Sequence, residues 1–174
     1  LLAVGTALFA TTQGGTYRTT NSGSTWTHAD VGLPVNVPAL AVLGTTLFAG
    51  VWHGVFSSTD NGTLWTAVNT GLDARRVLAF AVFDTTLFAG TENSGVFCTT
   101  NNGTNWVQVN TGLTIPYVRT LGATANGLFA GTRGGGLFRT TNNGTNWAAL
   151  SHGFPQDPVG AILVSGTNLF AGMG

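Results

Sequence analysis

Charge is what this sequence has least of. Its 174 residues include no lysine, and six arginines balance six acidic residues, so the formal net charge is zero. Charged residues make up 7% of the chain, whereas soluble domains usually contain about 25%. A protein that binds nucleic acid needs a basic surface. We therefore expect no nucleic-acid partner.

Cysteine and long apolar runs are also scarce. Cys98 is the only cysteine, which excludes an internal disulfide framework and a cysteine-rich zinc site. No apolar run approaches the roughly 18 residues of a membrane-spanning helix, and we expect no membrane span. The chain is nevertheless 43% hydrophobic and 10% aromatic, which is too apolar for a disordered segment. The sequence therefore predicts a folded domain.

An internal repeat organises the whole chain. The tripeptide Leu-Phe-Ala recurs at spacings of 39, 40, 41 and 41 residues, and tryptophans recur in step with it. The tripeptides begin at Leu8, Leu47, Leu87, Leu128 and Leu169, and the tryptophans are Trp26, Trp65, Trp106 and Trp147. Only Trp52 stands outside this register. A period near 40 residues is typical of a four-stranded propeller blade or of a helical-pair repeat.

The local pattern decides between these two repeats. Residues 77–110 divide into short runs rich in β-branched and aromatic residues at 77–83, 86–90, 95–99 and 106–109, with Gly, Asn and Asp turns between them. Such runs predict strands joined by hairpins, and no window shows apolar residues at helical spacing over three turns. We therefore predict an all-β protein, a β-propeller of four-stranded antiparallel blades.

Alignment of the repeats predicts one array of about 4.5 blades. The expected blades span residues 1–36, 37–74, 75–114 and 115–156, with a half blade at 157–174. The third and fourth strands of the last blade are missing. Three interpretations remain open: a window from a longer array, a blade completed by a neighbouring chain, or a half blade with an exposed edge, which invites aggregation. We favour the longer array.

Each full repeat contains a related eight-residue motif. Residues 58–65 read Ser-Thr-Asp-Asn-Gly-Thr-Leu-Trp, residues 19–26 read TTNSGSTW, and residues 99–106 and 140–147 both read TTNNGTNW. The motif resembles the Asp-box (BNR repeat), Ser/Thr-x-Asp-x-Gly-x-Thr-Trp, of sialidases, related glycosidases and photosystem assembly-factor-like propellers. Its Asp position is occupied by Asn21, Asp60, Asn101 and Asn142. The resemblance implies a propeller fold and says little about function.

The motif has a local physical role. It falls on the hairpin between the third and fourth strands, where a short Asp or Asn side chain accepts hydrogen bonds from backbone amides and Gly supplies a positive φ. We expect the tryptophan to begin the fourth strand and to pack over the hairpin. The motif is therefore interpreted as structural.

Three hairpin tips also contain Asn-Gly-Thr. Asn61, Asn102 and Asn143 are acceptors of the glycosylation type at equivalent repeat positions. Asn-Gly equally suits a tight turn, and we favour that interpretation. An intact mass equal to the bare chain would exclude glycosylation.

The residues that depart from the repeat fall mostly on one predicted face. It carries the connections between second and third strands and those that lead from a fourth strand to the next blade. The candidate ligand-binding or partner-binding residues there are Trp52, His53, Arg75, Arg76, Glu92, Tyr117, Arg119 and Arg133. Aromatic rings could stack on sugars or partner side chains, and arginines could bind carboxylates through two parallel hydrogen bonds. The alternative is that loops vary freely on any surface.

Catalysis is not expected. The sialidase resemblance implies an arginine triad, a tyrosine nucleophile with a glutamate partner, and an aspartate acid/base. Glu92 is the only glutamate, and Tyr117 has no glutamate near it in sequence. Ordinary glycoside hydrolysis needs two facing carboxylates. His28, His53 and His152 occupy non-equivalent repeat positions, so we expect neither a metal site nor a cofactor.

The function expected from the sequence is a non-catalytic extracellular or cell-surface scaffold, used for self-assembly or for recognition of protein or carbohydrate. The alternatives are a non-catalytic part of a secreted sialidase-like glycoside hydrolase, and a lectin. The extracellular location follows from the resemblance and from the few charges and cysteines. Self-association is expected because a neutral surface without lysine lacks the charge on which solubility usually relies.

Overall fold

The computed structural model describes residues 1–73, 76–150 and 157–173, and this part of the chain forms strands and turns. The first sheet contains β1 (Leu2–Val4), β2 (Ala7–Thr12), β3 (Gly15–Thr19) and β4 (Thr27–His28). The second contains β5 (Ala39–Leu43), β6 (Thr46–Val51), β7 (Gly54–Ser58) and β8 (Thr66–Ala67).

The remaining sheets repeat this order. The third contains β9 (Val77–Phe83), β10 (Thr86–Thr91), β11 (Val96–Thr99) and β12 (Val107–Gln108). The fourth contains β13 (Val118–Thr124), β14 (Gly127–Thr132), β15 (Leu137–Thr140) and β16 (Ala148–Ala149), and the fifth pairs β17 (Val159–Ser165) with β18 (Asn168–Met173). All pairings are antiparallel. The predicted propeller of about 4.5 blades is therefore confirmed.

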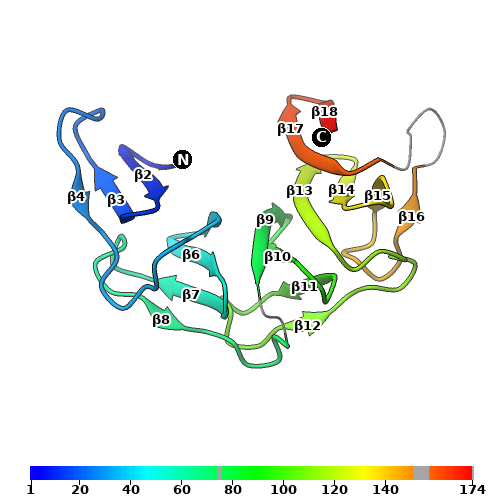
Figure 1. Ribbon diagram of the computed structural model, residues 1–174, viewed down its shortest axis with the longest axis horizontal. Helices are drawn as coiled ribbons and strands as arrows, with labels where there is room; N and C mark the ends of the chain where they lie inside the picture. Colours follow the sequence, from blue (N-terminus) through cyan, green and yellow to red (C-terminus); the bar gives the residue numbers. More distant parts are fainter. Residues whose placement is uncertain (74–75, 151–156, 174) are drawn as a thin grey trace.

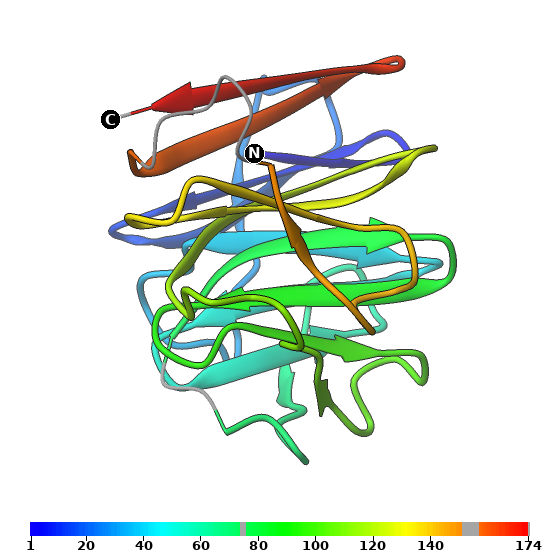
Figure 2. The same cartoon turned by 90° about the vertical axis from the view of Figure 1, so that its right-hand side faces the viewer.

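The sheets fan around a common axis and form an open arc, with the two termini on either side of its gap (Figure 1). The first strands of neighbouring sheets, β5, β9, β13 and β17, lie next to one another along the inside of the arc. The short fourth strands β4, β8, β12 and β16 form its outer rim. Figure 2 shows the sheets stacked as successive layers. Residues at the starts of the first strands of different sheets therefore lie close together near the axis of the arc.

The core lies between the sheets, and the Leu-Phe-Ala repeat builds it. Successive side chains of a strand point to opposite faces, so the phenylalanine of one sheet meets the leucine of the next. Phe48 packs with Leu87 and Trp106, and Phe48 and Leu87 are fully buried. In the two-stranded last sheet, Phe170 is 56% exposed, since the described chain places no sheet against that face.

The hairpins between third and fourth strands share one hydrogen-bond pattern. In the third sheet, Asn101 Oδ1 accepts from the Thr99 hydroxyl at 2.8 Å and from the Asn105 amide at 3.0 Å, while the Gly103 amide donates to Thr99 Oγ1 at 3.0 Å. Asn102 and Gly103 have φ of 54° and 80°. The other three hairpins repeat these bonds around Asn21, Asp60 and Asn142.

The tryptophans make contacts that the sequence did not predict. Trp106 packs against the preceding sheet, where its indole Nε1 donates to the Val68 carbonyl at 2.8 Å and its amide to the Thr70 carbonyl at 2.8 Å. Trp65 and Trp147 make equivalent bonds. β12 begins one residue after Trp106. The reason is that the groove between two sheets offers the ring both burial and a hydrogen-bond acceptor. Trp26 is 40% exposed, since no described sheet precedes the first.

Candidate functional site

Four of the candidate residues line one hollow of about 610 Å³ at the inner end of the sheets. Arg76 stands directly before β9, Tyr117 directly before β13 and Arg119 within β13, whereas Arg133 directly follows β14. The antiparallel order places the start of each first strand beside the end of the second, so these residues converge. The rest of the lining is Leu78, Pro158 and Gly160.

Polar and aromatic contacts connect this hollow across the third and fourth sheets. Arg76 Nη1 lies 3.7 Å from Glu92 Oε1, and the Tyr117 hydroxyl donates to the same oxygen at 3.4 Å. The Arg133 guanidinium carbon lies 5.4 Å from the centroid of the Tyr117 ring. Backbone bonds hold the connections together, from the Glu92 amide to the Arg76 carbonyl at 3.0 Å and from the Arg133 amide to the Tyr117 carbonyl at 3.1 Å.

A second hollow of about 480 Å³ adjoins the first and shares Arg76 with it. Trp52 lines this hollow and is 52% exposed. The Arg76 guanidinium carbon lies 4.7 Å from the centroid of the Trp52 ring, a cation–π arrangement that orients both side chains. The other lining residues are mostly small or polar: Thr11, Thr12, Gln13, Asn36, Val37 and Pro38.

A third hollow of about 330 Å³ lies along the first strands and joins the other two. It shares Leu78, Arg119 and Gly160 with the first hollow, and Thr11 and Pro38 with the second. The three hollows are therefore parts of one depression around the axis of the arc. We call the surface formed by Trp52, Arg76, Glu92, Tyr117, Arg119 and Arg133 the loop face.

Two candidates do not join this arrangement. His53 is exposed in the connection between β6 and β7 and is not among the residues that line the three hollows. Arg75 lies outside the described residues. The structure thus brings together six of the eight candidates, drawn from the second, third and fourth sheets.

The hairpins lie at the opposite end of the sheets. Thr100 and Asn102 share a hollow there with the β5–β6 and β9–β10 turns. The asparagines of the sequons are exposed and have φ of 58°, 54° and 53° for Asn61, Asn102 and Asn143. These values suit an Asn-Gly turn. Whether they are glycosylated stays a prediction.

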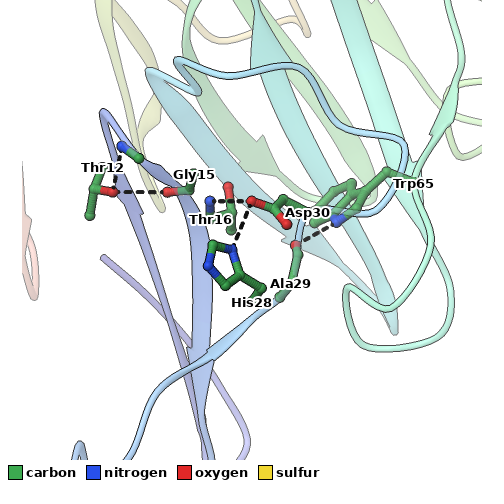
Figure 3. A network of polar contacts seen from close by, with 8 residues as sticks. Thr12, Gly15, Thr16, His28, Ala29, Asp30 and Trp65 are labelled. Carbon is green, nitrogen blue, oxygen red and sulfur yellow. Dashed lines mark hydrogen bonds and ion pairs between the residues drawn. The ribbon is translucent and has the colours of Figure 1, made fainter.

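A repeated anchor between third and fourth strands was not anticipated from the sequence. Asn110 Oδ1 accepts from the Val96 amide at 2.7 Å, and Asn69 Oδ1 accepts from the Val55 amide at the same distance. In the first sheet Asp30 takes this position, with Oδ2 3.4 Å from the Thr16 amide and 3.3 Å from His28 Nδ1 (Figure 3). Asp30 therefore serves the scaffold. The signal was the Asp or Asn residue that stands two positions before each Gly-Leu pair, at Asp30, Asn69 and Asn110.

Other chemistry finds no support in the described part of the chain. It contains no group of three or more His, Cys, Asp or Glu side chains arranged to hold a metal ion. It contains no helix of the length and apolar character that crossing a membrane requires. Burial raises the pKa of the Cys98 thiol above its ordinary 9.0, so this thiol stays protonated and a poor nucleophile near neutral pH.

Solved structures with similar folds include a sensor domain, a glycoside hydrolase and a designed protein. The extracellular domain of a putative one component system from B. thetaiotaomicron superposes with a TM-score of 0.81 at 18% identity, over 99% of this chain and 24% of that one. A GH74 xyloglucanase from Xanthomonas campestris superposes with a TM-score of 0.66 at 16% identity, over 87% of this chain and 29% of that one. The computationally designed Ika8 protein superposes with a TM-score of 0.72 at 13% identity, over 99% of this chain and 54% of that one. At these identities the likeness shows the fold alone.

The chain thus spans about a quarter of the length of the two natural proteins. No curated protein matches the sequence. A family model, the DUF6242 beta propeller domain, matches residues 40–168, which cover the second to fourth sheets and most of the fifth. The chain belongs to the DUF6242 β-propeller domain family.

Proposed function

We propose that this chain is part of a non-catalytic extracellular propeller that recognises a protein or carbohydrate ligand through the loop face. One observation carries the proposal. The side chains that depart from the repeat, contributed by three sheets, meet around connected hollows. The turns do not need the side chains of Glu92 and Arg133, because these two residues bond to the neighbouring connection through their backbone amides, while Thr91 and Thr132 supply the side-chain bonds of the turns.

The shape of the loop face supports recognition. Ligand sites are concave, and they combine apolar or aromatic surface with a few converging polar groups. Tyr117, Arg119 and Arg133 meet this description in the first hollow, and Trp52 does so in the second. Binding residues are also concentrated on loops that a rigid scaffold positions.

The arrangement of carboxylates favours binding over hydrolysis. Glycoside hydrolases place two carboxyl groups about 5–10 Å apart across the scissile bond. In the described chain no aspartate or glutamate is among the residues that line the three hollows. Glu92, which is not among the lining residues, contacts Arg76 and Tyr117. We therefore propose no catalytic step.

The extracellular location is part of the proposal. Its support is the fold shared with the extracellular domain of the B. thetaiotaomicron protein, together with the Asp-box-like motifs and the low content of charge and cysteine.

A glycan array and a panel of extracellular proteins test the proposal. We expect the wild-type chain to bind at least one of them, and Tyr117→Ala to lose that binding. The matched control is Thr45→Ala, which changes an exposed residue in the β5–β6 turn at the opposite end of the sheets. If Thr45→Ala lost binding and Tyr117→Ala kept it, recognition would lie elsewhere on the chain. That result would contradict the proposal.

Self-association is a separate part of the proposal. Its support is the neutral surface and the exposed Leu163 and Phe170 on one face of the last sheet, since exposed apolar surface favours association. Sedimentation velocity should show concentration-dependent oligomers. A clean monomer at high concentration would refute this part.

A further inference from the structure

We infer that the first hollow binds a carboxylate group of an acidic oligosaccharide, and that a neighbouring neutral sugar of the same ligand stacks on Trp52 in the second hollow. The inference rests on the proposed recognition role of the loop face. It adds the chemical class of the ligand and the part played by each hollow.

The charges around the first hollow favour an anion. Arg76, Arg119 and Arg133 all line it, and no acidic residue of the described chain does. Glu92 is close enough to pair with Arg76, at 3.7 Å. Arg119 and Arg133 are exposed, so their guanidinium groups remain open to a ligand. A guanidinium group binds a carboxylate through two parallel N–H···O bonds.

Two of the arginines are already oriented. Arg133 lies over the Tyr117 ring, and its amide donates to the Tyr117 carbonyl. Arg76 lies over the Trp52 ring and beside Glu92. A side chain that is ordered before binding loses less conformational entropy when the ligand arrives. The packing of each guanidinium on an aromatic ring therefore favours binding at this place.

The second hollow favours a neutral sugar beside the carboxylate. Trp52 presents a half-exposed ring there, which suits stacking against the apolar face of a sugar. Thr11, Thr12, Gln13 and Asn36 offer hydroxyl and amide groups for sugar hydroxyls. Among the described residues, Arg76 is the only cation that lines this hollow. A ligand in which acidic and neutral units alternate fits this arrangement better than a peptide with consecutive acidic side chains.

The volumes suit such a ligand. At about 610 Å³ and 480 Å³, both hollows fall within the range of roughly 300–1,000 Å³ found for small-molecule sites. They adjoin at Arg76, so one short oligosaccharide could occupy both. Arg76 would then contact both of its units.

Calorimetry with matched sugars tests the inference. The probe is a tetrasaccharide in which glucuronate alternates with N-acetylglucosamine, and its control is the same sugar with each carboxylate reduced to an alcohol. We expect the acidic form to bind at least about 10-fold more tightly, since a hydrogen bond to a charged group contributes enough for such a ratio. Its affinity should fall as salt is raised.

Variants assign the two hollows. Arg133→Gln and Arg119→Gln should each weaken the acidic sugar about 10-fold and leave the reduced sugar unchanged. Trp52→Ala should weaken both sugars. Thr45→Ala should bind both as the wild type does. Circular dichroism checks that every variant keeps the native strand content.

The outcomes separate this inference from the proposed function. Equal binding of acidic and reduced sugars would overturn the carboxylate site and leave a carbohydrate-binding loop face intact. Binding of a penta-glutamate peptide in place of either sugar, with loss in Arg133→Gln, would overturn the saccharide assignment in favour of an acidic protein partner. No binding of any of these probes at millimolar concentration would overturn the inference, while the array screen would still decide the proposed function.

Discussion

The hairpin end and the loop face of the same sheets differ in how strictly the residue type repeats from sheet to sheet. At the hairpin end, the Asp or Asn side chain accepts a hydrogen bond from the backbone amide four residues later, at 3.0 Å, in each of the four four-stranded sheets. At the other end of these sheets, the position directly after the second strand carries four different residues. They are Gln13, Trp52, Glu92 and Arg133.

The difference has a structural cause. At the hairpins, side chains supply the hydrogen bonds that hold the turn, so the residue type is restricted. At the other end, the residue directly after the second strand bonds through its backbone, as the Arg133 amide does to the Tyr117 carbonyl. The side chain after the second strand is therefore free to vary. The hairpin end of each full sheet is committed to the fold, whereas the other end combines fixed anchors such as Asn110 and Thr132 with a variable position that is available for binding.

The largest expected loss of stability comes from removing one of the tryptophans that are buried between sheets. Trp106→Ala should lower the free energy of unfolding by about 3–5 kcal/mol, because removing a buried aromatic ring leaves a cavity and the ring is only 2% exposed. It also leaves the Val68 carbonyl without its donor. Urea denaturation followed by circular dichroism measures the change.

Trp52→Ala is the matched control for that measurement. Its ring is 52% exposed and contacts Arg76, so the cost should stay below about 1 kcal/mol. Equal losses of unfolding free energy in the two variants would show that the loop face is as important to the fold as the groove between sheets. The two ends of the sheets would then not differ in their structural role.

The link between sheets offers a second test. Gly71 has φ of 79°, and a Cβ atom there would overlap the Trp106 carbonyl oxygen. Gly71→Ala should therefore cost about 2–4 kcal/mol, from the left-handed conformation and the overlap together. The control is Gly5→Ala, where φ is 57° and no atom lies within 4 Å of the added Cβ.

The control isolates the overlap. Gly5→Ala should cost only about 1 kcal/mol, the penalty of the backbone conformation. Unfolding midpoints of the two variants, measured side by side, give the difference. If both lose the same amount, the contact between the segment at Gly71 and the next sheet's tryptophan does not hold the sheets together.

The sequence predicted the parts of this fold that arise from local repetition. Alternation and turn residues placed β9 at its observed bounds and identified the hairpins, because both depend on neighbours in sequence. It missed the burial of Trp106 between sheets, since that contact joins residues 38 positions apart. Repeat alignment assigned Arg76, Tyr117 and Arg133 to one face, but only the stacking of sheets shows that they surround one hollow.

The smallest effect tests the one aspartate among the four hairpin positions. Hydrogen bonds from the Leu64 amide and the Ser58 hydroxyl lower the pKa of Asp60 below its ordinary 3.8. The folded state therefore favours the ionised form. The resulting stabilisation is present above pH 3.8 and is lost as the pH falls through the lowered pKa. Asp60→Asn should match the wild type near pH 7, because asparagine serves the other three hairpins.

Below pH 3.8 the two proteins should diverge. The wild type should lose stability relative to Asp60→Asn, because only the carboxylate has to be protonated. Urea midpoints at pH 7, 5 and 3 measure this divergence, and Asn101→Asp provides the reciprocal variant, since Asn101 accepts the same two bonds. Asn101→Asp should gain the acid sensitivity that Asp60→Asn loses. Parallel pH curves for all three proteins would mean that charge at this position is immaterial and that hairpin geometry alone selects Asp or Asn.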